Sequence, residues 1–418
     1  MAIAFNTLTE TAYQTLRYTL IKQVEESGNV SLTPYVDSVG IPTIGFGFNI
    51  GANAQAILKG LGSERPENTA EQIYVNRIAA IGNTTYQQTA EGKLKLQADL
   101  NKVMADRAKD PNITGVKRST FSFVNESEIK SVFNALSEKY EDTILRWQNQ
   151  NGLSNIPFSA ERAVIFSFAY GSRNLLGAGL ASAIRDNNRA EAWYEIRYNS
   201  NGDNQHAKRR YLEAEIFGLY RNGTGPANKD EAYNVYQMFT AQRSDILTYE
   251  NSYESQISQA NLELAEAQLT QYHVNILSDE LKSAATLLSN VYGQGRIFDS
   301  LSIQAASSEL KNLTGDKNSS NTNDLLLGDN THNNLNGGAG SDVLAGGLGN
   351  DNLNGGAGND KLIGGTGFDS YIISGNDTVI DSDGKGSIQT DTGIFIRSDG
   401  SEGELAINDE IINWKLVA

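Results

Sequence analysis

The chain has 418 residues, more than one ordinary domain holds, so two or three domains are expected. Apolar residues make up 39% and charged residues 20%, which is typical of soluble globular proteins, and no apolar run approaches the roughly 18 residues of a membrane-spanning helix. The net charge is −16, and residues 315–418 alone carry 16 acidic and 5 basic side chains, a surplus that would repel nucleic acid.

The N-terminus lacks the basic start and apolar core of a cleaved signal peptide, so export would have to depend on another part of the chain. Cysteine is absent, which fits either chance or a chain that enters an oxidising space unfolded.

Residues 1–225 are predicted to form a mostly helical domain with a small hairpin. Apolar side chains recur at helical spacing from Leu16 to Val24, and again over residues 127–147 and 160–186. A polar stretch punctuated by glycines separates the first helix from the others. The domain carries almost no net charge, with 24 basic and 23 acidic side chains.

The polar stretch contains two groups of residues with catalytic potential. Glu25-Glu26 ends the first predicted helix, and residues 35–47 read Tyr-Val-Asp-Ser-Val-Gly-Ile-Pro-Thr-Ile-Gly-Phe-Gly. Cleavage of a glycosidic bond needs a carboxylic acid that protonates the leaving oxygen and a second polar group for the water or the cation. A glutamate at a helix end, faced by Asp37 and Thr43 on a hairpin, would provide both.

The stretch resembles the catalytic region of phage-type lysozymes, whose pattern is Glu followed by Tyr-x-Asp-x-x-Gly-x-x-Thr-Ile-Gly-x-Gly. The resemblance implies that Glu26 is the acid, Asp37 the second carboxylate and Thr43 the water-positioning residue. It also implies inverting hydrolysis of the muramic acid–glucosamine linkage of peptidoglycan, with no metal in the chemistry. The Glu26-to-Asp37 gap is two residues longer than usual, which leaves Glu25 as a rival acid.

The resemblance extends over most of residues 12–220. Residues 162–170 resemble the core helix of the family, and residues 192–193 and 208–217 resemble its closing segments. Two positions depart from the family pattern: Phe48 replaces a common histidine and Gly171 replaces an asparagine.

Residues 226–312 are predicted to form a helical spacer. The segment has two glycines, and no proline occurs in it after Pro226, while apolar and aromatic residues step by three and four from Ile246 to Leu264. A plain packed spacer is the simplest interpretation. A partner-binding coiled coil is the alternative, although its seam would be polar.

The last segment, residues 313–418, contains a nine-residue repeat. Glycine pairs start successive copies at Gly337, Gly346, Gly355 and Gly364, and two weaker copies precede them at 319–327 and 328–336. The sixth position of the copies holds Asp324, Asn333, Asp342, Asp351, Asp360 and Asp369. The eighth position holds Leu326, Leu335, Leu344, Leu353, Leu362 and Tyr371.

This pattern predicts a coil of short parallel strands. Glycines allow positive φ in tight turns, and one apolar side chain per repeat can face inward. A core of one leucine per nine residues is thin, so the sixth-position side chains and turn carbonyls are expected to hold several structural Ca²⁺ ions, hard cations that take six to eight oxygen ligands.

Here the chain resembles the RTX repeats of exported bacterial proteins. The resemblance implies a calcium β-roll, secretion through type I machinery and folding outside the cell. Residues 375–380 look like the exit from such a roll, and residues 411–418 could hold an uncleaved secretion signal.

The sequence therefore predicts a multidomain protein: an α+β, mostly helical, lysozyme-like domain (1–225), a helical segment (226–312) and a C-terminal parallel β-roll (313–418). The leading hypothesis is a secreted muramidase that acts on peptidoglycan. The alternatives are a wall-binding or scaffold protein that no longer cleaves, and a protein whose helical segment is the active part, for example in adhesion or membrane contact.

Overall fold

The computed structural model describes residues 3–26, 30–65, 67–200, 206–293, 295–315 and 322–390, and the strands at 395–399, 403–407 and 410–414. The chain forms two compact units. We call Phe5–Arg185 with Gln259–His273 the helical unit, and Met1–Ala4 with Asp186–Ser258 and Val274–Ala418 the roll unit. The domain boundaries predicted at residues 225 and 312 would separate segments that fold independently. Compactness does not test independent folding, so these boundaries stay a prediction.

The helical unit is built around one buried helix. Every residue of α6 from Ala160 to Ala169 is buried, as expected for a helix that is covered on all sides. Glu141 binds both Arg17 (2.6 Å) and Arg162 (2.8 Å), and these ion pairs join α1, α5 and α6. The helices are α1 (Glu10–Glu26), α2 (Ile50–Gly60), α3 (Thr69–Gly82), α4 (Ala90–Lys109), α5 (Glu126–Gln150), α6 (Ala160–Gly171), the 3-10 helix η1 (Arg173–Leu175) and α7 (Ala178–Arg185).

A small antiparallel sheet follows α1, in the order β1 (Ser31–Val36), β2 (Pro42–Gly45) and β3 (Phe48–Asn49). Its sharp turn requires a glycine: Gly45 has φ +75°, and a Cβ there would lie 2.7 Å from the ring of Phe48. Phe48 itself is buried and packs on Phe46, with ring centroids 4.8 Å apart. The residue that replaces the histidine of the lysozyme pattern is thus a core residue here.

The helices of the roll unit are α8 (Arg189–Tyr194), the π-helix η2 (Glu195–Asn199), α9 (Ala207–Phe217), α10 (Lys229–Tyr253) and α12 (Leu277–Tyr292). The last two confirm the helical segment expected after residue 226. Helix α11 (Gln256–Glu266) begins in the roll unit and ends in the helical unit. The buried guanidinium of Arg197 donates to Glu250 (3.2 Å) and to the carbonyl of Asn275 (3.0 Å), which ties η2 to α10 and to the chain before α12.

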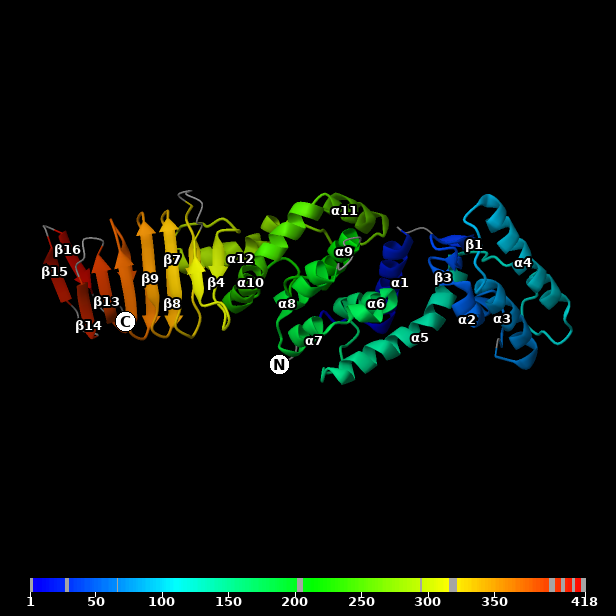
Figure 1. Ribbon diagram of the computed structural model, residues 1–418. Coiled ribbons are helices and arrows are strands. Elements are labelled where there is room, and N and C mark those ends of the chain that lie inside the picture. The colour runs from blue at the N-terminus through cyan, green and yellow to red at the C-terminus, as the bar shows by residue number, and fades with distance from the viewer. Residues whose placement is uncertain are drawn as a thin grey trace. The chain divides into compact units, whose positions relative to one another are not determined.

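Two parallel sheets form the roll, which Figure 1 shows from yellow to red. Each nine-residue repeat crosses from one sheet to the other, so strands that pair within a sheet are mostly 18 residues apart: Leu326 pairs with Leu344 and Leu344 with Leu362. The first sheet contains β4 (Ile303–Ala305), β6 (Leu325–Leu327), β8 (Val343–Leu348), β10 (Lys361–Thr366) and β12 (Thr378–Ile380). The second contains β5 (Asn312–Thr314), β7 (Asn334–Ala339), β9 (Asn352–Ala357), β11 (Asp369–Ile373) and β13 (Lys385–Thr390), and it ends in β14 (Phe395–Asp399), which is antiparallel to β13. Strand β15 (Gly403–Ile407) pairs with β16 (Glu410–Trp414).

The eighth-position residues form the core of the roll, as predicted. All six are at most 3% exposed and pack in one cluster, which Ala306 and Leu313 extend at the start. The expected fold class is confirmed: a largely helical N-terminal region with a small antiparallel sheet, followed by a C-terminal parallel β-roll.

The first strand of the roll lies against α10 (Figure 1). Thr240 Oγ1 accepts a hydrogen bond from the backbone N–H of Ala305 (2.9 Å), and Gln237 donates to the carbonyl of Ala306 (2.5 Å). Tyr233 reaches one turn further and donates to the carbonyl of Gly328. A helix thus covers a sheet edge that would otherwise present unpaired backbone groups.

The strands begin earlier than the composition indicates. Composition places residues 303–305 in the helical spacer, but they form β4 and pair in parallel with β6. The nonapeptide pattern starts later because this first turn has no glycine pair, and its backbone groups bond to α10 instead. Among the residues that the structure describes, no helix has the length and apolar character needed to cross a bilayer.

We predict that Thr240→Val lowers the free energy of unfolding of the roll unit in calcium by about 1–3 kcal/mol, because it leaves the buried N–H of Ala305 without an acceptor. Thr248→Val is the matched control, since Thr248 is exposed on the same helix and donates only to Ser244. It should stay within about 0.5 kcal/mol of the parent in urea unfolding. Equal losses in both variants would contradict the described role of Thr240.

Candidate metal centre and hairpin carboxylates

The sixth-position residues fall into two columns, because successive repeats contribute their strands alternately to the first and the second sheet. Asp324, Asp342 and Asp360 follow the loops that enter the first sheet, and Asn333, Asp351 and Asp369 follow the loops that enter the second. We call these the aspartate columns.

One carboxylate oxygen of Asp342, Asp351, Asp360 and Asp369 holds the columns together. Asp342 Oδ1 accepts from the N–H of Asp324, and Asp360 Oδ1 accepts from the N–H of Asp342, each at 2.8 Å. Asp369 Oδ1 accepts from the N–H of Asp351 at the same distance in the other column. Every bond joins residues 18 apart, so the columns link each turn of the roll to the next on the same edge.

The other carboxylate oxygen has no partner. Oδ2 of Asp342, Asp351, Asp360 and Asp369 is buried without a hydrogen bond, and these residues are at most 1% exposed. A buried carboxylate oxygen that lacks a partner carries a large desolvation cost. Four such atoms in one register indicate positions for a cation.

Backbone carbonyls converge on the same places. A Cβ on Gly337 would lie 2.4 Å from Asp342 Oδ2 and 2.6 Å from the carbonyl oxygen of Gly355, one turn further along. At Gly346 the corresponding atoms are Asp351 Oδ2 (2.4 Å) and the carbonyl oxygen of Gly364 (2.7 Å). Glycine is therefore required at the start of the repeat, because a side chain would fill this oxygen-lined space.

Burial raises the pKa of these four carboxyl groups, and neighbouring carboxylates add to the effect in each case. The pKa rises to about 7 for Asp342 and Asp369 and to about 6 for Asp351, and that of Asp360 is also raised. Desolvation is the largest cause in each case. Near neutral pH, the ionised columns therefore need a counter-ion.

The oxygen-only donor set fits Ca²⁺. In the described part of the chain, no three carboxylate, imidazole or thiol groups come together in one metal-binding cluster. Each ion would hence bind mainly to loop carbonyls and to a few carboxylate oxygens. Examples are Oδ2 of Asp342 in the first column and Oδ2 of Asp351 in the second. When bound, calcium supplies the positive charge that allows the columns to ionise.

Asn333 differs from the other five predicted ligands. Its Oδ1 accepts from the N–H of Asp329 (2.8 Å), and its buried atom without a partner is the amide nitrogen Nδ2. A neutral amide brings no negative charge, so this turn offers the weakest of the predicted calcium positions.

Asp377 is a column residue that the nine-residue period does not pick out. Its Oδ1 accepts from the N–H of Asp360 at 2.8 Å, which continues the first column by one turn. The spacing there is 17 residues instead of 18, so Asp377 falls out of register with the repeat, although its Gly-Asn-Asp context was a usable signal. Asp381 is also buried in part, and it accepts from the hydroxyl of Tyr371 (2.6 Å).

In the helical unit, Asp37 and Thr43 lie on the predicted hairpin. Asp37 Oδ1 accepts from the N–H groups of Val39 (3.0 Å) and Ile41 (2.8 Å), so this oxygen shapes the turn between β1 and β2. Thr43 is 3% exposed, pairs with Tyr35 and donates its hydroxyl proton to the carbonyl of Ile41 (3.0 Å). The hairpin thus holds both residues close to one turn.

Glu25 and Glu26 end α1 beside this hairpin. A Cβ on Gly47 would lie 3.9 Å from Glu25 Oε2, and the charge of Glu25 contributes to the raised pKa of Tyr140 on α5, although burial of the phenol is the larger cause. Glu25 therefore faces the glycine turn after Thr43. The side chain of Glu26 lies outside the described residues, and its predicted role stays a prediction.

The comparison with known protein families gives a match in the roll. Residues 319–353 and 336–371 match the model of the RTX calcium-binding nonapeptide repeat (4 copies). The C-terminal region carries RTX repeats. The matched residues include all six sixth-position residues, and such repeats are typical of calcium-binding, secreted proteins. No curated protein and no solved structure matches the chain.

The raised pKa values predict how pH acts on the calcium-free roll. The folded roll keeps protons on Asp342, Asp351 and Asp369 that an unfolded chain releases near pH 4, where an ordinary aspartate titrates at about 3.9. The stability that these protons contribute is complete below about pH 4 and is lost as pH rises through about 7.

In chelator, the strand signal of the roll in circular dichroism should therefore be larger at pH 5, where the columns are protonated, than at pH 8, where the roll is open. In saturating calcium this preference should disappear or reverse, because protons compete with the cation. A chelated roll that gains stability between pH 5 and pH 8 would be inconsistent with the buried columns.

A second prediction concerns Asn333→Asp, which would complete the second column. Because calcium affinity follows the number of charged ligands, we expect the midpoint of a calcium titration to fall on the order of tenfold. Asn334→Asp is the matched control, as the neighbouring exposed side chain points away from the column and gains the same charge. If both substitutions shift the midpoint equally, the position of the carboxylate has no special role.

Proposed function

We propose that this chain is a secreted muramidase whose calcium-folded roll serves export and folding outside the cell. The activity rests on the resemblance of residues 25–47 to the catalytic region of phage-type lysozymes. The arrangement that supports it best is local: α1 ends in two glutamates beside a hairpin that carries Asp37 and Thr43.

The proposed acid is one of the two glutamates. Glu26 follows from the resemblance, whereas Glu25 faces Gly47 in the hairpin and lies near the phenol of Tyr140. General acid catalysis needs a carboxyl group that stays protonated until it meets the leaving oxygen, which burial against apolar groups favours. The acid would protonate the glycosidic oxygen of the muramic acid–glucosamine linkage.

Asp37 and Thr43 would act on the opposite side of the bond. Oδ1 of Asp37 is held by two backbone N–H groups, and Oδ2 would face a water molecule or the developing positive charge. The hydroxyl of Thr43 donates to Ile41, so its lone pairs remain available to accept a hydrogen bond from that water. The three groups together would support inverting hydrolysis.

The roll would control when the secreted protein reaches its final form. Extracellular calcium modules bind at about 10⁻⁴–10⁻³ M, far above cytosolic calcium. The aspartate columns would therefore keep the roll open inside the cell, as passage through type I secretion machinery requires, and close it outside.

A second candidate is a wall-binding protein without cleavage. It is favoured by Phe48 and Gly171, which replace the histidine and asparagine of the family pattern, and by the near-zero net charge of residues 1–225. Such a protein would bind peptidoglycan and leave its glycan strands intact.

The test is loss of turbidity of a peptidoglycan suspension by Glu25→Gln and Glu26→Gln variants. Removal of the acid should slow clearing by about 10²- to 10⁴-fold, with unchanged circular dichroism, since the substitution is nearly isosteric. Asp142→Asn, at an exposed carboxylate on α5, is the control and should clear normally. Normal clearing by both glutamate variants, or no clearing by the parent, would reject the muramidase.

A further inference from the structure

The two outer faces of the roll differ in kind. On the first sheet, Leu325, Leu327 and Val343 alternate with the core leucines and so point outward, yet each is at most 1% exposed. On the second sheet, the outward residues Asn334 and Asn352 are exposed to solvent. The first face is covered by the chain itself, and the second is open.

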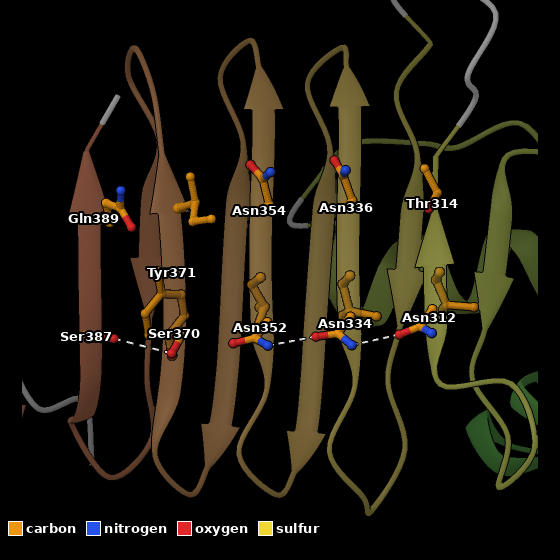
Figure 2. A pocket seen from close by; sticks show the side chains of 14 residues that line it. Asn312, Thr314, Asn334, Asn336, Asn352, Asn354, Ser370, Tyr371, Ser387 and Gln389 are labelled. Atoms are coloured by element: carbon orange, nitrogen blue, oxygen red, sulfur yellow. Dashed lines mark hydrogen bonds between the residues drawn. The ribbon is translucent and has the colours of Figure 1, made fainter. Parts of the chain in front are cut away.

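The open face carries a groove of about 580 Å³ between two rows of polar side chains (Figure 2). Both rows run across the strands, and Leu335 and Leu353, which lie between them along the strands, also line the groove. We call it the amide groove, and its characteristic side chains are Asn312, Asn334 and Asn352 in the first row and Asn336, Asn354 and Gln389 in the second.

The first row is fixed by its own hydrogen bonds. The amide of Asn334 donates to Asn312 Oδ1 and the amide of Asn352 donates to Asn334 Oδ1, each at 2.7 Å. Each donating amide keeps a second N–H, which the ladder does not use. The side chains of Asn336 and Asn354 make no hydrogen bond with described residues, so the second row presents whole amide groups.

No side chain that lines the groove is charged, although residues 315–418 carry 16 acidic and 5 basic groups. The acidic surroundings would repel a polyanion. A polycation would find no carboxylate in the groove to bind. Ile372, 45% exposed, pairs with Asn354 of the second row and adds an apolar contact to the groove. The chemistry thus fits an uncharged ligand with hydroxyl and amide groups.

The spacing of the rows indicates a linear, repeating ligand. Successive amides are one strand apart, about 4.8 Å, and the two rows are two residues apart along a strand, about 7 Å. An extended peptide advances by about 3.4 Å per residue and would lose register with the rows. A linear glycan carries ring hydroxyl and acetamido groups at regular intervals, so it can place such groups on the amides of several strands.

We propose that the amide groove binds the N-acetylated glycan strand of peptidoglycan, with the acetamido and hydroxyl groups of the sugars on the two rows of amides. The choice of this glycan rests on the proposed function. The roll would then anchor the protein to the wall while the helical unit acts on the same polymer.

The experiment uses the full chain with Glu25→Gln and Glu26→Gln, in calcium, so that the glycan is not cleaved. Binding is measured by calorimetry with a β-1,4-linked N-acetylglucosamine hexamer and by co-sedimentation with purified peptidoglycan. Asn336→Ala with Asn354→Ala should weaken both by about tenfold or more, since two amides lose their contacts. Asn149→Ala with Asn251→Ala, on exposed helix positions, is the matched control and should bind as the parent does.

Equal binding by the groove variant and the parent, with the same calcium-dependent circular dichroism, would overturn the proposal. No binding of the hexamer by the parent would overturn it as well. Turbidity assays of the chain with both glutamates restored separate the two ideas. Groove-dependent binding without any clearing would reject the muramidase activity and support the glycan-binding groove. Normal clearing without groove-dependent binding would support the muramidase activity and reject the groove.

Discussion

The roll depends on how its buried carboxylates are neutralised. Four aspartates of the columns each use one oxygen to accept from the backbone one turn away, and leave the other oxygen buried without a partner. The leucine ladder is one side chain wide per repeat and cannot by itself force these groups together. Calcium therefore acts as part of the core, and its binding energy is folding energy.

The helical part of the roll unit holds the start of the roll. Helix α10 meets the first strand through Thr240 and Gln237, so the roll starts on a preformed surface instead of a bare edge. Arg296, just before β4, donates to the carbonyls of Asp342 (3.1 Å) and Asn359 (3.0 Å) and so joins two successive loops of one column. The helical unit contains no comparable column among its described residues, and its core rests on α6 and on the ion pairs of Glu141.

The roll could be predicted from the sequence because particular residue types recur every nine positions. Glycine occurs where a side chain would collide, aspartate at the sixth position and leucine at the eighth. What lacked that period was missed, namely Asp377 at a spacing of 17 residues and the strand Ile303–Ala305. The hairpin followed from its glycines, but a resemblance in sequence cannot decide between adjacent acids such as Glu25 and Glu26. The amide groove needed the structure, because only strand pairing places its asparagines in rows.

The most direct measurement is hydrogen exchange of the full chain, followed by mass spectrometry, in millimolar calcium and in chelator. We expect the backbone amides of β6 to β11 to be protected in calcium and to exchange rapidly in chelator, while α1, α5 and α6 stay protected in both. Strong protection of β6 to β11 in chelator would show that the columns close without a cation, and it would contradict the role of calcium as part of the core.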